Sequence, residues 1–171
     1  PKLHVVEASK GADSISITDE EEKKEHGAID PHLWLSPKGG EIEAANIRDA
    51  LIEMDPKDKE YFTSNYDKFH SDMEAMYTEY NQKFADAPRH EIVTGHAAFA
   101  YLCRDFGLTQ DSVEDVFASG EPGTKRMTEL IDFCKAHQVK TVFVEDMVSP
   151  NVSQTIANEA GADVQKIYTM E

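Results

Sequence analysis

Residues 139–144, Val139-Lys140-Thr141-Val142-Phe143-Val144, are the stretch of sequence that most directly decides the fold. Five of these six residues are β-branched or aromatic, and a short run of this kind predicts a buried strand. Apolar residues at steps of three and four predict a helix over 124–137, before the strand, and Ser149-Pro150 is a typical helix start after it. A strand with a helix on each side is typical of right-handed βαβ units, whose strands are parallel.

The same alternation of strands and helices extends over residues 87–171. Residues 91–94 predict a strand, and the helical spacing after it continues to Gly107, which ends that helix. We expect further strands at 112–117 and 164–168. The predicted fold class is therefore α/β with a mostly parallel sheet. The apolar helix faces expected to be buried comprise Phe99, Leu102, Cys103, Phe106, Met127, Leu130, Ile131, Cys134, Val152, Ile156 and Ala157.

Two helices are predicted before this region. Ser36-Pro37 begins the first, and Asp55-Pro56 ends it and begins the second. The second is expected to run unbroken from about 57 to 85, and about 29 residues at 1.5 Å each give a rod of about 40 Å. Such a rod is either part of a coiled coil or a strut between two lobes, and its aromatic and Met content favours packing on a globular body. The apolar stripes are Ala44, Ile47, Leu51 and Met54 on the first helix, and Phe62, Tyr66, Phe69, Met73, Met76, Tyr80 and Phe84 on the second.

Composition and charge exclude some classes of function. The chain has 17 Lys and Arg against 33 Asp and Glu, a net charge of −16. Such acidity argues against binding nucleic acid or an anionic membrane, because both need a basic surface. No apolar run approaches the roughly 18 residues that span a bilayer. We expect a strand at residues 2–8 and take the sequence to be a piece of a longer protein.

Two features leave alternatives open. The charge run at 19–26 lies within the predicted loop 10–27. It is either a solvated surface loop or a segment that weakly attracts cations near a metal site. Cys103 and Cys134 lie on apolar stripes of predicted helices, so they are either two buried thiols or a disulfide.

Candidate site residues follow the predicted strands. Ligands in open α/β sheets bind beyond the carboxyl ends of the strands. His96 follows strand 91–94, Glu145 and Asp146 follow strand 139–144, and Glu171 follows strand 164–168. Imidazole and carboxylate groups that converge at one edge suit zinc or another first-row metal. Phosphate-binding glycine loops, the nucleophile elbow and the His-Glu-x-x-His helix do not occur in this sequence.

Several motifs occur together in one order. They are Asp30-Pro31-His32-Leu33-Trp34-Leu35-Ser36-Pro37, then Thr94-Gly95-His96-Ala97-Ala98-Phe99-Ala100-Tyr101, then Glu121-Pro122-Gly123-Thr124-Lys125, then Phe143-Val144-Glu145-Asp146-Met147-Val148-Ser149-Pro150. This set, with the opening Val5-Val6-Glu7-Ala8-Ser9-Lys10-Gly11, resembles the metal-binding solute-binding proteins of ABC transporters, the zinc and manganese uptake lipoproteins.

The resemblance implies a two-lobed receptor with one metal ion between the lobes. It divides the chain into the remainder of an amino-terminal lobe (1–55), a linking helix (56–86) and a carboxyl-terminal α/β lobe (87–171). It also implies that His32, His96 and Glu171 are metal ligands, while the family's first histidine ligand belongs to a stretch that this sequence does not contain. Manganese members carry Glu where this chain has His96, so the resemblance implies Zn²⁺.

The implied function is extracytoplasmic zinc binding, with delivery of Zn²⁺ to the permease of a bacterial ABC importer and no catalysis. The parent is expected to be a lipid-anchored or periplasmic protein, and this chain to self-associate through apolar surface near Trp34 and the long helix. The alternatives are a manganese receptor of the same family, a surface adhesin and a zinc hydrolase with Glu145 as base.

Overall fold

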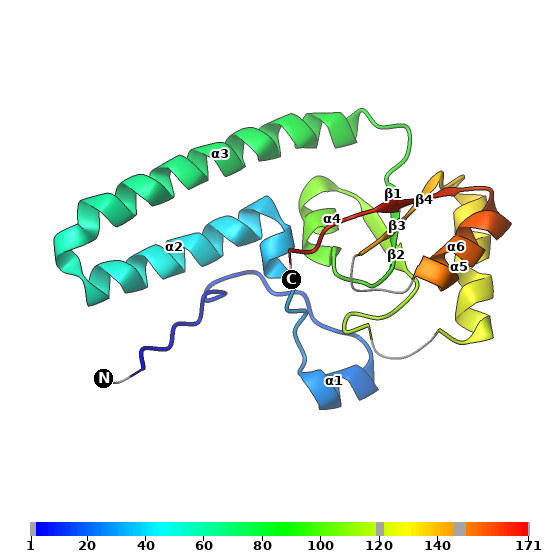
Figure 1. Cartoon of the computed structure of the whole chain (residues 1–171), viewed down its shortest axis with the longest axis horizontal. Coiled ribbons are helices and arrows are strands. Elements are labelled where there is room, and N and C mark those ends of the chain that lie inside the picture. The colour runs from blue at the N-terminus through cyan, green and yellow to red at the C-terminus, as the bar shows by residue number, and fades with distance from the viewer. Residues whose placement is uncertain (1–2, 119–121, 146–149, 171) are drawn as a thin grey trace.

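A computed structural model describes residues 3–118, 122–145 and 150–170 of the chain. Its centre is a four-stranded sheet with the order β2-β1-β3-β4, and every neighbouring pair is parallel. The α/β prediction is thereby confirmed (Figure 1). The strands are β1 (Glu91–Thr94), β2 (Thr109–Ser112), β3 (Thr141–Val144) and β4 (Asp163–Lys166).

Helices cover both faces of the sheet. On one face, α5 (Thr124–Ala136) and α6 (Pro150–Ala160) pack through Leu130, Cys134 and Ile156 onto the inner strands. On the other, α4 (Ala100–Phe106) and the 3₁₀ turn η1 (Leu33–Leu35) share a second apolar cluster. Gly107 ends α4 in the left-handed conformation, at φ 67°, as its position in the sequence predicts. The sheet is therefore a buried platform between two apolar layers.

The strand predicted at 112–117 is wrong in position. The observed strand β2 spans Thr109–Ser112 and pairs only with β1, at the edge of the sheet. Its four residues, Thr109, Gln110, Asp111 and Ser112, are all polar, so no apolar signal marks them as a strand.

The two predicted helices before the sheet form an antiparallel hairpin. They are α2 (Pro37–Met54) and α3 (Lys59–Ala85), and the 3₁₀ turn η2 (Pro56–Asp58) joins them. Helix α3 is unbroken over 27 residues. Figure 1 shows the hairpin reaching away from the sheet, while the end of α3 returns to α4. There Tyr77 and Phe84 each have ring centroids 5.1 Å from that of Phe106.

The apolar stripe predicted to be buried on α2 is largely exposed. Ile47 is 48% exposed and Met54 is 60% exposed. Polar side chains instead face α3: the Arg48 guanidinium lies 4.2 Å from the centroid of Tyr66, and Glu41 Oε1 lies 3.1 Å from His70 Nδ1. On α3, Phe62, Met76 and Phe84 are half-buried, whereas Phe69 is 37% exposed. The amphipathic pattern of α2 is thus real, but within this chain little covers its apolar side.

The amino-terminal segment also differs from the expectation. Its described residues 3–8 form no strand, and Val5 is exposed. The acidic run expected as a loop contains a short helix, α1 (Glu20–His26). An isolated antiparallel bridge between Ser16 and Ile29 joins the two ends of the segment that contains this helix. Across the described residues, we find no helix with the length and apolarity that a bilayer span requires.

The alternative for the cysteines is also resolved. Cys103 and Cys134 are free and buried. Cys103 belongs to the apolar cluster under α4 and Cys134 to the cluster under α5 and α6. The two thiols therefore serve as small apolar groups in different cores.

Candidate metal centre

The order of the strands decides where a ligand can bind. The chain leaves β1 toward β2 on one side and then crosses to β3 on the other, so the order reverses between β1 and β3. A crevice opens at the carboxyl ends of the strands at such a switch point. His96 lies two residues beyond β1, and Glu145 follows β3 directly. Asp146 and Glu171, which the sequence also nominates, lie outside the described residues.

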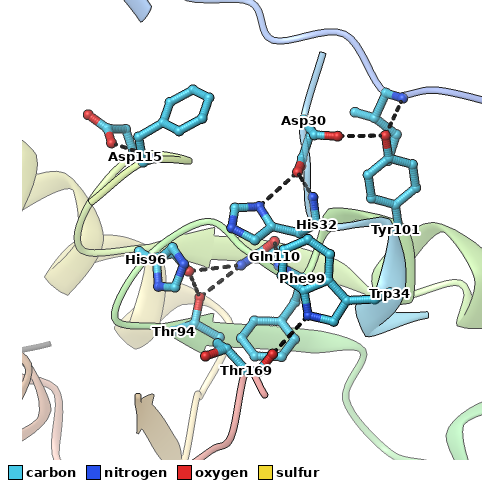
Figure 2. A network of polar contacts seen from close by, with 12 residues as sticks. Asp30, His32, Trp34, Thr94, His96, Phe99, Tyr101, Gln110, Asp115 and Thr169 are labelled. Carbon is cyan, nitrogen blue, oxygen red and sulfur yellow. Dashed lines mark hydrogen bonds and ion pairs between the residues drawn. The ribbon is translucent and has the colours of Figure 1, made fainter. Parts of the chain in front are cut away.

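The backbone around His96 is fixed by a small network (Figure 2). The Thr94 hydroxyl donates to the His96 carbonyl at 2.6 Å. Gln110 Nε2 donates to Thr94 Oγ1 at 2.8 Å and to the same carbonyl at 3.3 Å, so the edge strand β2 braces the turn after β1. Because Thr94 and His96 are both buried, these bonds stabilise one backbone path for His96.

His32 is held mainly by its own neighbours in the chain. Asp30 Oδ1 accepts from the His32 backbone N–H at 2.9 Å and lies 2.8 Å from His32 Nδ1. The Asp30 carbonyl in turn accepts from the Tyr101 hydroxyl at 2.8 Å, and that hydroxyl accepts from the Ile15 N–H at 3.1 Å. Tyr101 on α4 therefore ties the His32 turn to the α/β unit.

The fold brings His32 and His96 together although 64 residues separate them in sequence. Their ring centroids lie 5.4 Å apart, and the residues are 4% and 5% exposed. Zn–N bonds of about 2.0–2.1 Å put each ring centroid about 3.2 Å from the ion, so two imidazoles on one tetrahedral zinc have centroids about 5 Å apart. The observed spacing fits two histidine ligands of one metal ion.

Trp34 connects the His32 turn to the end of the chain. Its ring centroid lies 5.5 Å from that of His32, and its Nε1–H donates to the Thr169 carbonyl at 2.9 Å. Thr169 is buried and stands two residues before Glu171. The segment that leads to the predicted carboxylate ligand therefore lies beside His32.

The surroundings of the two histidines are acidic. Glu145, which is 3% exposed, accepts from the His96 N–H at 3.3 Å, and the same Oε1 lies 3.3 Å from His96 Nδ1. Burial raises the pKa of Glu114, and the carboxylates of Asp115 and Glu145 raise it further. Carboxylates gathered in this way give the surroundings of the two histidines a negative potential.

The charge run at 19–26 reaches the same region. Asp19 and Glu22 of this run line a cavity of about 230 Å³ together with two other acidic residues and with apolar side chains such as Ile15 and Ile17. Burial raises the pKa of Glu22, and a hydrogen bond with Asp115 adds to the shift. The run therefore packs against the α/β unit in part, unlike a fully solvated loop. The acidic residues of the cavity are Asp19, Glu22, Asp30 and Asp115.

Four of the other five histidines make contacts elsewhere, and the fifth, His4, is exposed. His70 pairs with Glu41, His137 with Glu91, and the His90 ring with the Phe84 carbonyl. The His26 ring stacks on Phe117 at 4.2 Å. Within the three described ranges, no group of three or more His, Cys, Asp or Glu side chains could hold a metal ion.

Sequence reasoning missed two residues that support this site. Asp30 stands inside the first motif, two residues before His32, and its position in a turn before a histidine is a signal that could have found it. Gln110 carries no such signal, because its role depends on the pairing of β2 with β1.

The parallel sheet and the switch point define an α/β protein in which two buried imidazoles lie at a spacing that suits one metal ion. The profile of the family described as "Zinc-uptake complex component A periplasmic" matches residues 1–171, so the chain belongs to this ZnuA family.

Two curated relatives illustrate the match. A putative metal-binding protein of Treponema pallidum (strain Nichols) is 45% identical over 85% of this chain and 46% of its own length. The high-affinity zinc uptake system protein ZnuA of Bacillus subtilis (strain 168) is 33% identical over 97% of this chain and 54% of its own. The chain thus spans about half the length of these curated relatives.

A solved structure agrees with the fold. The laminin-binding protein Lmb of Streptococcus agalactiae, described as bifunctional with adhesin and metal transporting activity, superposes with a TM-score of 0.88 and 34% identity. The match covers 96% of this chain and 61% of that one. The metal-receptor fold implied by the sequence is therefore confirmed.

Proposed function

We propose that this chain is the metal-binding part of an extracytoplasmic zinc receptor that delivers Zn²⁺ to an ABC importer. The observation that carries the proposal is the pair of buried histidines, His32 and His96, with ring centroids 5.4 Å apart at the switch point of the sheet. The zinc uptake described for the B. subtilis relative and the metal transport described for the S. agalactiae relative support it.

The proposed protein ligands are His32, His96 and Glu171. Two imidazole nitrogens favour Zn²⁺ over the harder Mn²⁺, which prefers carboxylate and water oxygens. Binding without turnover is the proposed activity. A hydrolytic site needs a metal-bound water with a base beside it, and Glu145, the candidate base, already accepts from the His96 backbone.

We propose a division of the chain into three parts. Residues 1–55 belong to the amino-terminal lobe, and residues 87–171 form the α/β lobe that carries the sheet. Residues 56–86 form the helix that links the two lobes. The separation of the α2–α3 hairpin from the sheet supports this division (Figure 1). The proposed partner is the importer's permease, and the proposed location is the periplasm or, as a lipoprotein, the outer face of the membrane.

The test is zinc binding by the 171-residue chain, measured by competition with a chromophoric chelator at pH 7.5, where free imidazole is largely neutral. We expect one Zn²⁺ per chain, preferred over Mn²⁺ at equal free concentrations. His96→Ala should weaken zinc binding at least roughly ten-fold, which corresponds to a loss of about 1.4 kcal/mol of binding free energy.

The matched control is His4→Ala, which removes an exposed imidazole near the amino terminus. It should bind zinc like the parent chain. Equal affinity for both variants, or preference for Mn²⁺, would refute the proposed function.

Adhesion is a second candidate, because the S. agalactiae relative is described as an adhesin as well as a metal transporter. Surface plasmon resonance on immobilised laminin distinguishes the two. Saturable binding that His96→Ala leaves unchanged would support an adhesin activity separate from the metal site.

A further inference from the structure

Both candidate ligand histidines have a buried carboxylate on the same ring nitrogen. His32 Nδ1 lies 2.8 Å from Asp30 Oδ1, and His96 Nδ1 lies 3.3 Å from Glu145 Oε1. The two carboxylates come from unrelated places, one from the turn two residues before His32 and the other from the end of β3. The shared arrangement is therefore a feature of the site and not of one motif.

An ionised carboxylate can only accept a hydrogen bond, so the imidazole nitrogen that faces it carries the proton. A neutral imidazole with its proton on Nδ1 has its lone pair on Nε2. Each ring thus presents Nε2 as the metal-binding atom.

Both carboxylates are deeply buried, at 2% exposed for Asp30 and 3% for Glu145. Each also accepts from the backbone N–H of the histidine it serves, at 2.9 Å for His32 and 3.3 Å for His96. Asp30 Oδ1 therefore fixes both the backbone and the ring of His32. Glu145 Oε1 fixes the backbone of His96 and faces its ring at an ion-pair distance of 3.3 Å, without the geometry of a hydrogen bond to Nδ1.

We propose that Asp30 and Glu145 are positioning residues that hold His32 and His96 in the Nδ1–H tautomer with Nε2 directed at the metal. This inference deepens the proposed function, and its metal-affinity part rests on that function. Its tautomer part does not, because it concerns which ring nitrogen faces a carboxylate, and that can be measured without any metal.

The tautomers are tested directly by long-range ¹H–¹⁵N NMR of the metal-free chain at pH 8. We expect His32 and His96 to carry the proton on Nδ1. In Glu145→Ala the His96 proton should shift toward Nε2, while His32 stays unchanged, and Asp30→Ala should do the reverse. Protonation of Nε2 in both histidines of the parent chain would overturn the proposal whatever the chain binds.

The second measurement is metal affinity and the absorption spectrum of bound Co²⁺, a reporter of ligand geometry. Glu145→Ala and Asp30→Ala should each weaken zinc binding by roughly 10- to 100-fold, the range for partners behind a metal ligand. Glu145→Gln should recover part of that loss, because its amide oxygen can still face Nδ1–H of His96 and accept from the backbone N–H. The Co²⁺ spectrum should change in the Ala variants and return toward the parent spectrum in the Gln variant.

Asp105→Asn is the matched control. Asp105 is also a carboxylate with a buried side chain, but it binds the Ser36 hydroxyl and Arg104. This variant should lower the thermal midpoint without changing either tautomer or the Co²⁺ spectrum. If Glu145→Gln abolished zinc binding while the His96 tautomer stayed on Nδ1, Glu145 would be a metal ligand and the positioning role would be wrong.

Discussion

His32 and His96 are held by different kinds of contact at the scale of single residues. The partner of His32 is two positions away, so a local turn presents the ring. The partner of His96 is 49 positions away, on another strand. Folding of the sheet is therefore required before His96 is oriented, whereas His32 needs only its turn and the support of Tyr101.

The two cysteines give a prediction at the same scale. Burial raises the pKa of the Cys103 thiol to about 12 and that of Cys134 to about 11. At pH 8 both thiols are then protonated in the folded chain, and the thiolate is the reactive form. We expect iodoacetamide to leave both unmodified under native conditions and to modify both in 6 M guanidinium, as measured by mass spectrometry. Native labelling at the denatured rate would contradict their burial.

The start of α2 shows how an element is joined to the site. Ser36 occupies the N-cap position, but its side chain makes no cap hydrogen bond and donates to Asp105 on α4 instead. The Tyr77 hydroxyl on α3 donates to the Asp105 carbonyl at 3.2 Å. The helices α2, α3 and α4 therefore meet at Asp105. Ser36, which joins α2 to this junction, stands four positions after His32.

Gly39 provides the prediction for this junction. A Cβ at Gly39 would lie 2.0 Å from the Leu33 carbonyl oxygen, so η1 would have to move. We expect Gly39→Ala to lower the free energy of unfolding by about 1–3 kcal/mol, as overpacking does. It should also weaken zinc binding, because η1 follows His32 directly.

The neighbouring glycine is the control for that prediction. A Cβ at Gly40 meets nothing closer than 3.9 Å, and Gly to Ala inside a helix is worth about 0.5–1 kcal/mol of added stability. Urea denaturation of both variants measures the difference. Equal effects at the two positions would show that the contact between Gly39 and Leu33 carries no cost.

At the scale of the whole molecule, the α2–α3 hairpin leaves an apolar face uncovered. Ile47, Leu51 and Met54 share one side of α2 and are exposed. Exposed apolar groups on one helix face favour association. We therefore expect the 171-residue chain to associate with itself at micromolar to millimolar concentrations, as sedimentation velocity would measure.

The double variant Ile47→Lys, Leu51→Lys tests which surface is responsible. It should weaken self-association roughly ten-fold or more, which corresponds to about 1.4 kcal/mol of association free energy. The free energy of unfolding should stay within about 0.5 kcal/mol of the value for the parent chain. Glu53→Lys makes the same change in net charge on an exposed position of the same helix and should have a smaller effect. If both variants weakened association equally, charge and not the apolar face would control it.

Local pattern was sufficient for the elements whose residues contact their own neighbours. The strand at 141–144, the helices α5 and α6 and the end of α4 at Gly107 follow from β-branched runs, helical spacing and a glycine in the left-handed region. Pattern failed for β2, because a polar edge strand has no apolar period. It failed also for the burial of α2, because spacing shows that a face is apolar but not what covers it.

The sequence by itself determined the strand–helix alternation, the residue types of the site and the family resemblance, because these are written in short runs of neighbouring residues. Only the tertiary structure decided that His32 and His96 lie 5.4 Å apart, that Glu145 and Gln110 brace the turn of His96, and that the two thiols occupy separate cores. These contacts join residues far apart in the chain, and no local pattern encodes their distance. They form because packing helices on both faces of the parallel sheet removes apolar surface from water, and this brings the ends of β1 and β3 together.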